Sequence, residues 1–422
     1  MTIALPVSSP ARALVCRGCG AEHPLGPDHA CHHCLGPLEV GYDPDALRAV
    51  TREQIASGPP NLWRYAPLLP VGQDPAQRVS LDPGFTPLVP APALAAEVGV
   101  RGPLWVKDDS ANPTHSFKDR VVSVALTAAR AMGFTRYACA STGNLANSVA
   151  AHAARAGAES MVFIPADLEA AKVVTTAVYG GALVAVDGTY DDVNRLCGEL
   201  VESDELGDTA FVNVNLRPFY AEGSRTLAFE VAEQLGWRIP AQVVVPMASG
   251  ELLTKVDKGF SDLVEAGLAE PPTGGWRVFG AQSAGCQPIV AAFHAGADEV
   301  TPVRPTGIAR SLNIGDPAAG RYALAAVRRT GGWMESADDD EIREGIRLLA
   351  RTTGIFTETA GGVTVAVLRK LVASGRLDPD AETVVLNTGE GLKTPDAVAH
   401  TVGPTHRVRP SLRSAREAGL LG

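Results

Sequence analysis

The sequence contains no long apolar run, no excess of positive charge and no internal repeat. A membrane-spanning helix needs about eighteen or more consecutive apolar residues, and no segment of the chain reaches that length, so we expect no transmembrane helix. The net charge of -10 argues against a general binder of nucleic acid or of anionic membrane surfaces. The first ten residues lack the basic and apolar stretches of a secretory signal, and we therefore expect a cytoplasmic protein.

The chain does contain enough apolar residues for a large core. Hydrophobic residues make up 45% of its 422 residues, which is typical of a globular protein, and this length predicts two or three structural units. Short apolar segments alternate with segments of helical periodicity, and this alternation predicts parallel sheets covered by helices on both faces. Ligands of such sheets bind at the carboxyl ends of the strands. The expected strands are Leu104–Val106, Arg136–Ala140, Glu159–Ile164, Leu183–Val186, Ala210–Val214, Val243–Pro246, Val278–Ala281 and Val384–Leu386.

Four of the seven cysteines form two closely spaced pairs near the N-terminus. Each pair has the Cys-x2-Cys spacing and glycines lie near both turns, so four thiolates could complete a tetrahedron around zinc. We expect a structural zinc ribbon, because about forty residues are too few to build a core without a metal. The alternatives are reduced cysteines without metal, disulfides, or a histidine ligand in place of one cysteine. The expected ligands are Cys16, Cys19, Cys31 and Cys34, and the nearby histidines are His23, His29, His32 and His33.

A lysine lies where a helix is expected to begin. Lys118 follows the strand Leu104–Val106 and precedes an Ala-rich helix expected over Val121–Arg130. A cation at a helix N-terminus opposes the helix dipole, and the dipole favours loss of the amine proton. A neutral amine can form a Schiff base with a carbonyl cofactor. The alternative is an exposed lysine in a simple ion pair with Asp119.

The segment around Lys118 resembles the cofactor-lysine motif of the threonine synthases, which are fold-type II pyridoxal-phosphate enzymes. It reads Asn-Pro-Thr-His-Ser-Phe-Lys-Asp-Arg over residues 112–120, with His115 where the family usually has glycine. The resemblance implies that Lys118 carries the cofactor pyridoxal 5'-phosphate. It also implies an α/β fold of two domains with parallel sheets, similar to the tryptophan synthase β chain, here preceded by the zinc ribbon.

Three further turns resemble cofactor-binding parts of the same family, although each taken alone is an ordinary helix cap or strand end. Asn144 matches the residue that bonds the phenolic oxygen of the cofactor, and Thr388 matches the one that bonds the pyridine nitrogen. The turn after the strand Val243–Pro246 matches the loop that holds the cofactor phosphate, and it opens a helix whose N–H groups suit an anion. This loop departs from the family in having one glycine and an acid, Glu251. Its expected phosphate-binding residues are Ala248, Ser249, Gly250, Glu251 and Leu252.

Residues 213–226 resemble the segment that lines the substrate phosphate site in threonine synthases. Its arginines suit bidentate phosphate binding, although ion pairs with Glu222 or Glu230 are an alternative. The expected substrate-binding residues in the whole chain are Thr86, Lys107, Ser141, Thr142, Asn215, Arg217 and Arg225.

Together these matches lead to one functional interpretation. The resemblance implies conversion of O-phospho-L-homoserine and water to L-threonine and phosphate, with Lys118 as the catalytic residue and with pyridoxal phosphate and structural zinc as cofactors. The alternatives are a related lyase or synthase, such as a serine/threonine dehydratase or a cysteate synthase, and a catalytically silent protein whose ribbon docks a partner. We expect a homodimer with no nucleic-acid or membrane partner.

The expected domain organisation begins with a zinc-ribbon segment at residues 1–45. Residues 46–107 are expected to form a linker and the start of a large domain, and residues 108–220 a smaller α/β domain. The rest of the large domain is expected over residues 221–405, followed by a basic tail over residues 406–422.

Overall fold

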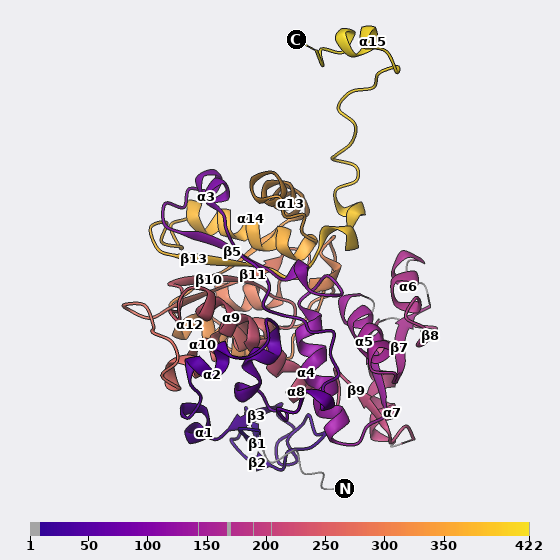
Figure 1. Ribbon diagram of the computed structural model, residues 1–422, viewed down its shortest axis with the longest axis vertical. Helices are drawn as coiled ribbons and strands as arrows, with labels where there is room; N and C mark the ends of the chain where they lie inside the picture. The colour runs from indigo at the N-terminus through magenta and orange to yellow at the C-terminus, as the bar shows by residue number, and fades with distance from the viewer. Residues whose placement is uncertain (1–8, 142, 167–169, 189, 204, 422) are drawn as a thin grey trace.

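The computed structural model describes residues 9–141, 143–166, 170–188, 190–203 and 205–421 (Figure 1). The first of the β-sheets in this part of the chain is a small ribbon near the N-terminus. Its strands are β1 (Ala11–Cys16), β2 (Glu22–His23) and β3 (Leu38–Tyr42). They pair antiparallel in the order β2-β1-β3, and the prediction of an N-terminal ribbon is confirmed.

The second sheet has six strands and is covered by helices on both faces. Its elements are β4 (Leu88–Pro90), α3 (Pro92–Val98), β5 (Leu104–Asp108), β10 (Gln242–Pro246), α10 (Glu251–Glu265), β11 (Arg277–Ser283), α11 (Pro288–His294), α12 (Gly320–Arg329), β12 (Met334–Ala337), α13 (Asp339–Thr353), α14 (Thr359–Ala373) and β13 (Thr383–Asn387). The strand order is β12-β11-β10-β13-β5-β4, and all neighbours are parallel except β4 with β5. Val243 faces the core formed with α10, α11 and α12, whereas Val244 faces the core formed with α3, α13 and α14.

The third sheet has four strands, which are joined by helices. Its elements are β6 (Arg136–Ala140), α5 (Asn144–Arg155), β7 (Glu159–Pro165), α6 (Ala170–Ala177), β8 (Ala182–Val186), α7 (Tyr190–Glu202) and β9 (Thr209–Phe211). The strands pair in parallel in the order β8-β7-β6-β9, so the prediction of parallel sheets is confirmed. Strand β9 ends before the expected Val214 because the chain turns there, and the N–H groups of Val214 and Leu216 donate to the carbonyl of Phe211.

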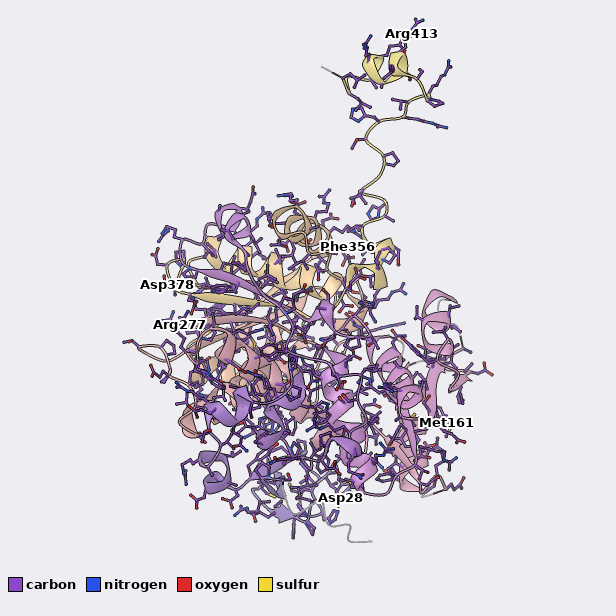
Figure 2. The ribbon with its side chains drawn as sticks, viewed as in Figure 1. Asp28, Met161, Arg277, Phe356, Asp378 and Arg413 are labelled. Carbon is purple, nitrogen blue, oxygen red and sulfur yellow. The ribbon has the colours of Figure 1, made fainter. Side chains whose placement is uncertain are left out.

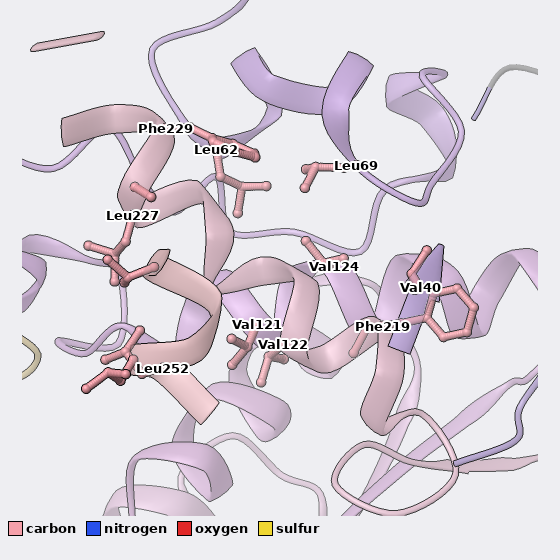
Figure 3. Close-up of a cluster of buried hydrophobic side chains, with 14 of the residues drawn as sticks. Val40, Leu62, Leu69, Val121, Val122, Val124, Phe219, Leu227, Phe229 and Leu252 are labelled. Atoms are coloured by element: carbon pink, nitrogen blue, oxygen red, sulfur yellow. The ribbon is translucent and has the colours of Figure 1, made fainter. Parts of the chain in front are cut away.

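One buried apolar cluster joins the ribbon to the rest of the molecule (Figure 3). The connecting elements are α1 (Pro44–Arg48), α2 (Arg52–Ala56), α4 (Lys118–Ala131), α8 (Arg217–Gly223) and α9 (Arg225–Gln234). Val40 of β3 belongs to the same cluster as Val124 of α4 and Phe219 of α8, and β3 packs against α8. The ribbon therefore shares its core with the helix that begins at Lys118.

Residues 59–90 belong to the segment over residues 46–107, which was expected to form a linker and the start of a large domain, and they contribute to the core. They contain the 3-10 helix η1 (Leu62–Leu68), in which Trp63 and Tyr65 are buried. The Tyr65 hydroxyl donates to Glu233 of α9 at 2.5 Å. The many prolines of this segment indicated a linker that wraps a domain, and the apolar side chains between the prolines are stabilised by burial.

The C-terminal tail, expected to be a surface helix or arm, extends away from the body of the molecule (Figure 1). It includes the short helix α15 (Leu412–Glu417), and Figure 2 shows Arg413 at the far end of this arm. Across the described residues, no helix combines the length and the apolar character needed to cross a bilayer. The domain boundaries given above stay predictions.

Phe219 tests the shared core, because its side chain is fully buried between the ribbon and α4. We predict that Phe219→Ala lowers the free energy of unfolding by about 3–5 kcal/mol, the usual cost of removing a buried phenylalanine side chain. Chemical denaturation measures this value. Val174→Ala, at an exposed position of α6, should change it by less than about 0.5 kcal/mol. Equal effects of the two substitutions would contradict a core that extends into the ribbon.

Candidate active site

Lys118 lies at the start of α4, beyond the end of β5. Its Nζ donates a hydrogen bond to the hydroxyl of Tyr220 in α8 at 2.9 Å and lies 4.5 Å from the ring centre of Phe117. Asp119 instead accepts hydrogen bonds from the backbone N–H and the hydroxyl of Thr114, at 2.6 and 2.7 Å. The described residues therefore show no simple Lys118–Asp119 ion pair, and a neutral hydroxyl holds the amine.

The backbone of the loop before Lys118 shows how this chain accommodates His115 where the family usually has glycine. His115 has a φ of 62°, in the left-handed region where a residue with a Cβ is disfavoured and glycine is not. Its N–H donates to the carbonyl of Asn112 at 2.8 Å, and its carbonyl accepts from the N–H of Glu390 at 3.1 Å. The backbone conformation that glycine would favour is thus kept here by hydrogen bonds.

A buried ionic network supports the start of α4. The Arg120 guanidinium bonds Asp109 at 2.6 and 2.7 Å and Glu230 at 2.5 and 2.7 Å. Although burial opposes ionisation, Arg120 and then Lys107 hold the pKa of Glu230 at about 2. The ammonium of Lys107 donates to Glu230 and to the carbonyl of Thr86, both at 2.7 Å, and the Thr86 hydroxyl donates to Asp109 at 2.7 Å. Lys107 and Thr86, predicted to bind substrate, thus have their polar groups engaged in this network.

The predicted Asn144 and Thr388 lie on two loops that are linked through Glu358, because the N–H of Glu358 donates to the carbonyl of Gly389 at 3.1 Å. The N–H of Phe117 donates to the carbonyl of Thr388 at 3.0 Å. The Asn144 amide donates to both carboxylate oxygens of Glu358, at 3.2 and 3.1 Å. Glu358 is almost fully buried, and burial raises its pKa above the ordinary value.

Sequence reasoning missed two residues of this cluster, Glu358 and Tyr220. The available signal for Glu358 was an acid placed among small residues at the start of a helix. The signal for Tyr220 was its place in the segment over residues 213–226. In both cases the partner is distant in sequence, since 102 positions separate Lys118 from Tyr220 and 214 separate Asn144 from Glu358.

The predicted phosphate loop joins β10 to α10. Because β10 and β13 are parallel neighbours, this loop and Thr388 leave the sheet at the same edge. Gly250 has a φ of 86°, and a Cβ there would lie 3.0 Å from the Cβ of Ala323 and 3.2 Å from the carbonyl oxygen of Ala319. Glycine is therefore strongly favoured at this position. Of the other loop residues, Ala248, Ser249 and Glu251 are half-buried and Leu252 is buried.

The two predicted phosphate-binding arginines lie in different environments. Arg225 is fully buried and pairs with Glu222 at 2.5 Å and Asp262 at 2.7 Å. Arg225 therefore forms an ion pair with Glu222, which was the alternative to phosphate binding. Arg217 begins α8 and is half-buried, and its side chain has no hydrogen-bonding or ionic partner within the described ranges. It lines a small cavity with Glu251 and other residues.

The remaining predicted substrate residues lie near the third sheet. Ser141 caps α5, because its hydroxyl accepts from the N–H groups of Gly143 and Ala146, both at 3.3 Å. The side-chain oxygen of Asn215 accepts from the N–H of Phe211 at 2.9 Å. Thr142 lies outside the described residues.

The four N-terminal cysteines form one cluster in the ribbon. Their sulfur atoms all lie within 4.8 Å of one another. The sulfurs of Cys16 and Cys34 are 3.5 Å apart, and those of Cys19 and Cys31 are 3.7 Å apart, which is too long for a disulfide. Tetrahedral zinc with bonds of about 2.3 Å would place its sulfur ligands about 3.8 Å apart, so the cluster fits zinc.

The surroundings of the cluster favour a thiolate at Cys16, whereas at Cys34 the N–H of Gly36 is outweighed by the neighbouring cysteine sulfurs, which raise the pKa to about 12. The N–H of Cys19, with a further N–H from Gly18, lowers the pKa of Cys16 to about 6. A Cβ at residue 36 would lie 3.0 Å from the sulfur of Cys16 and 3.2 Å from that of Cys34, so Gly36 lets the chain pass beside the sulfurs. His23 is 3.3 Å from the sulfur of Cys31. Among the described residues, the group that could hold a metal consists of the four cysteines, and the histidines lie outside it.

Comparison with known proteins gives consistent matches. Residues 79–389 match the family described as pyridoxal-phosphate dependent enzyme. The chain is 36% identical over 385 residues to the threonine synthase of Methanocaldococcus jannaschii, covering 90% of this chain and 93% of that protein. It is 34% identical over 408 residues to the threonine synthase of Methanosarcina acetivorans, covering 96% and 98%.

Solved structures share the fold at low sequence identity. The processed form of threonine deaminase isoform 2 from Solanum lycopersicum superposes with a TM-score of 0.62 at 20% identity, covering 75% of this chain and 81% of that one. O-acetyl serine sulfhydrylase isoform 3 from Entamoeba histolytica has a TM-score of 0.62 at 16% identity, covering 77% and 91%. The α/β architecture expected from the sequence is thus confirmed.

The raised pKa of Glu358 gives a testable dependence of stability on pH. A folded-state pKa above the unfolded value means that Glu358 favours folding while protonated, and that this contribution is lost as the pH rises through the folded pKa. Glu358→Gln stays neutral, so its Tm, measured without added ligand, should exceed that of the wild type increasingly as the pH rises above the ordinary glutamate pKa of about 4. The exposed Glu265→Gln is the control. A difference that is independent of pH would contradict the assignment.

Proposed function

The chain belongs to the pyridoxal-phosphate-dependent enzymes and, among them, to the threonine synthases, and we propose that the cluster around Lys118 converts O-phospho-L-homoserine and water to L-threonine and phosphate. The arrangement of α8 is the observation that supports this most directly. Tyr220 holds the amine of Lys118 at 2.9 Å. Arg217 lies on the same helix, three residues earlier, without an ionic partner in the described part of the chain. The residue that holds the amine, Tyr220, and a cation suited to phosphate, Arg217, therefore lie about one helical turn apart on α8.

The described residues fit the cofactor. The Ser116 hydroxyl, two residues before Lys118, is buried without a hydrogen-bonding partner in the described part of the chain, so the site has a polar group to offer a ligand. Lys118 would hold pyridoxal phosphate through its amine, Asn144 and Thr388 would hold the ring, and residues 248–252 would hold the phosphate. Bound pyridoxal phosphate supplies a ring that withdraws electrons from the α-carbon of an amino acid.

The protein's own groups would then act as follows. The amine of Lys118 moves protons at the α- and β-carbons of the substrate, and the Tyr220 hydroxyl keeps that amine oriented between transfers. Arg217 binds the substrate phosphate and stabilises the negative charge that develops as it leaves. Glu358 positions Asn144, because its carboxylate accepts both hydrogen bonds of the amide.

A second candidate is a related lyase or synthase that acts on another amino acid. A serine or threonine dehydratase has no phosphate to bind, so the unpaired, half-buried Arg217 favours a phosphorylated substrate instead. A catalytically silent ribbon protein is disfavoured by the arrangement of Lys118, Asn144 and Thr388 around one site.

The reaction is tested by mixing the protein and pyridoxal phosphate with O-phospho-L-homoserine and measuring threonine and phosphate together. We expect equal amounts of both, because the phosphate leaves and water adds in the same turnover. Phosphate released with a keto acid would show elimination without water addition. Lys118→Ala is the control and should lose both the products and the visible absorbance of the bound cofactor; an unchanged spectrum in this variant would contradict the role of Lys118.

We further propose that the ribbon holds structural zinc through its four cysteines, since a site with four thiolate ligands is closed to substrate. Cys16→Ser with Cys31→Ser should lose zinc in elemental analysis and lower the Tm, while the visible absorbance persists at saturating pyridoxal phosphate. His33→Gln, an exposed neighbour, should keep the metal. Full zinc content in the double variant would exclude this ligand set. A homodimer and a cytoplasmic location stay predictions.

A further inference from the structure

Arg17 connects the metal ribbon to the proposed cofactor loop. It lies between the ligands Cys16 and Cys19, and its guanidinium stacks 3.7 Å from the ring centre of Tyr322. One nitrogen of the guanidinium is 3.6 Å from a carboxylate oxygen of Glu251, and another is 3.8 Å from Glu39. The side chains of Arg17 and Glu251 are only 13% and 19% exposed, so solvent screens this pair less than an ordinary surface ion pair.

Glu251 places a carboxylate in a loop that is proposed to bind an anion. It is the first residue of α10 and directly follows Gly250, in the loop proposed to bind the cofactor phosphate. An unpaired carboxylate there would repel a phosphate dianion. Within the described ranges, Arg17 forms the ion pair with Glu251, and the ammonium of Lys255, one turn further along α10, also attracts this carboxylate.

The fold of the ribbon fixes where Arg17 lies. The N–H of Arg17 donates to the carbonyl of Pro37 at 3.0 Å, and the N–H groups of Gly18 and Cys19 point at the sulfur of Cys16, at 3.4 and 3.5 Å. A metal held by the four sulfurs would therefore set the backbone on both sides of Arg17. Without that metal, the turn between Cys16 and Cys19 loses the constraint that keeps Arg17 against Glu251.

The ribbon is also tied to the helix that Glu251 opens. Lys255, one turn further along α10, bonds Glu39 of β3 at 3.3 Å and Glu222 of α8 at 2.8 Å. The hydroxyl of Tyr42, at the end of β3, donates to Glu222 at 2.5 Å. The ribbon thus contacts α10 both at its first residue and one turn later.

We propose that Arg17 is a positioning residue through which the metal-loaded ribbon sets the affinity for pyridoxal phosphate. Arg17 neutralises Glu251 and so allows residues 248–252 to accept the cofactor phosphate. The inference rests on the proposed place of that phosphate. Because coupling between two binding sites is reciprocal, bound pyridoxal phosphate should also raise the affinity for zinc, so that a higher concentration of chelator is needed to remove the metal at equilibrium.

The test is a cycle of full-length variants, each checked for zinc content, with the Kd for pyridoxal phosphate measured by titrating cofactor-free protein. Arg17→Met should raise the Kd by at least about fivefold, the lower end of typical couplings between sites. Glu251→Gln should leave the Kd unchanged or lower it. The double variant should bind as Glu251→Gln does, because no carboxylate remains to be neutralised. Arg12→Met, on the exposed side of β1, is the matched control and should bind as the wild type.

Each other result would contradict the inference in a different way. An unchanged Kd for Arg17→Met at full zinc content means that Arg17 does not act on the cofactor. If Arg17→Met raises the Kd and the double variant with Glu251→Gln keeps that raised Kd, Arg17 only supports packing. If all variants of the cycle have equal Kd values, the phosphate does not lie beside Glu251. That result would overturn the proposed position of the cofactor phosphate, on which the inference rests.

A second measurement covers the case in which Arg17→Met fails to fold. Zinc is removed with a chelator from the wild type and from Glu251→Gln, and the Kd is measured before and after. Removal should raise the Kd of the wild type and leave that of Glu251→Gln unchanged. Equal increases in both proteins, or none in the wild type, would overturn the proposal.

Discussion

The buried guanidinium of Arg120 is the interaction on which the active-site arrangement depends. It pairs with Asp109, just beyond β5, and with Glu230 of α9, while Lys107 of β5 shares the Glu230 carboxylate. Removing one member of such a buried pair costs about 3–5 kcal/mol because a charge is left unpaired. These ion pairs hold strand β5, the loop before α4 and helix α9 in one arrangement. That arrangement sets the direction in which the side chain of Lys118 points from α4.

Much of the fold could be predicted because its signals are local. Strand β6 matches the expected range Arg136–Ala140 at both ends, since an apolar run is bounded there by polar residues. The cysteine cluster followed from spacing, because two short turns determine where four sulfurs can lie. The loop before Lys118 could be recognised for the same reason, and the positive φ of His115 shows that its backbone shape persists when glycine is replaced.

What could not be predicted depends on partners distant in sequence. Lys107 and Arg225 were predicted to bind substrate, Arg225 because its segment resembles a phosphate site. Lys107 instead pairs with Glu230, 123 positions away, and Arg225 pairs with Asp262 on another helix as well as with the nearby Glu222. Glu358 became noticeable only through its burial against Asn144. Residue type limits what a side chain can do, and only the tertiary structure decides which of those possibilities its neighbours leave open.

The position of β13 has a consequence for the order in which the protein can assemble. This strand lies between β10 and β5, yet its residues, Thr383–Asn387, are among the last of the sheet to be synthesised. The four-stranded sheet is complete by Phe211 and can form early, whereas β5 and β10 each wait with an unpaired edge until β13 has been synthesised. Open edges of this kind invite wrong pairings, so the nascent protein passes through a long interval in which protection by a chaperone matters more than the stability of the finished fold.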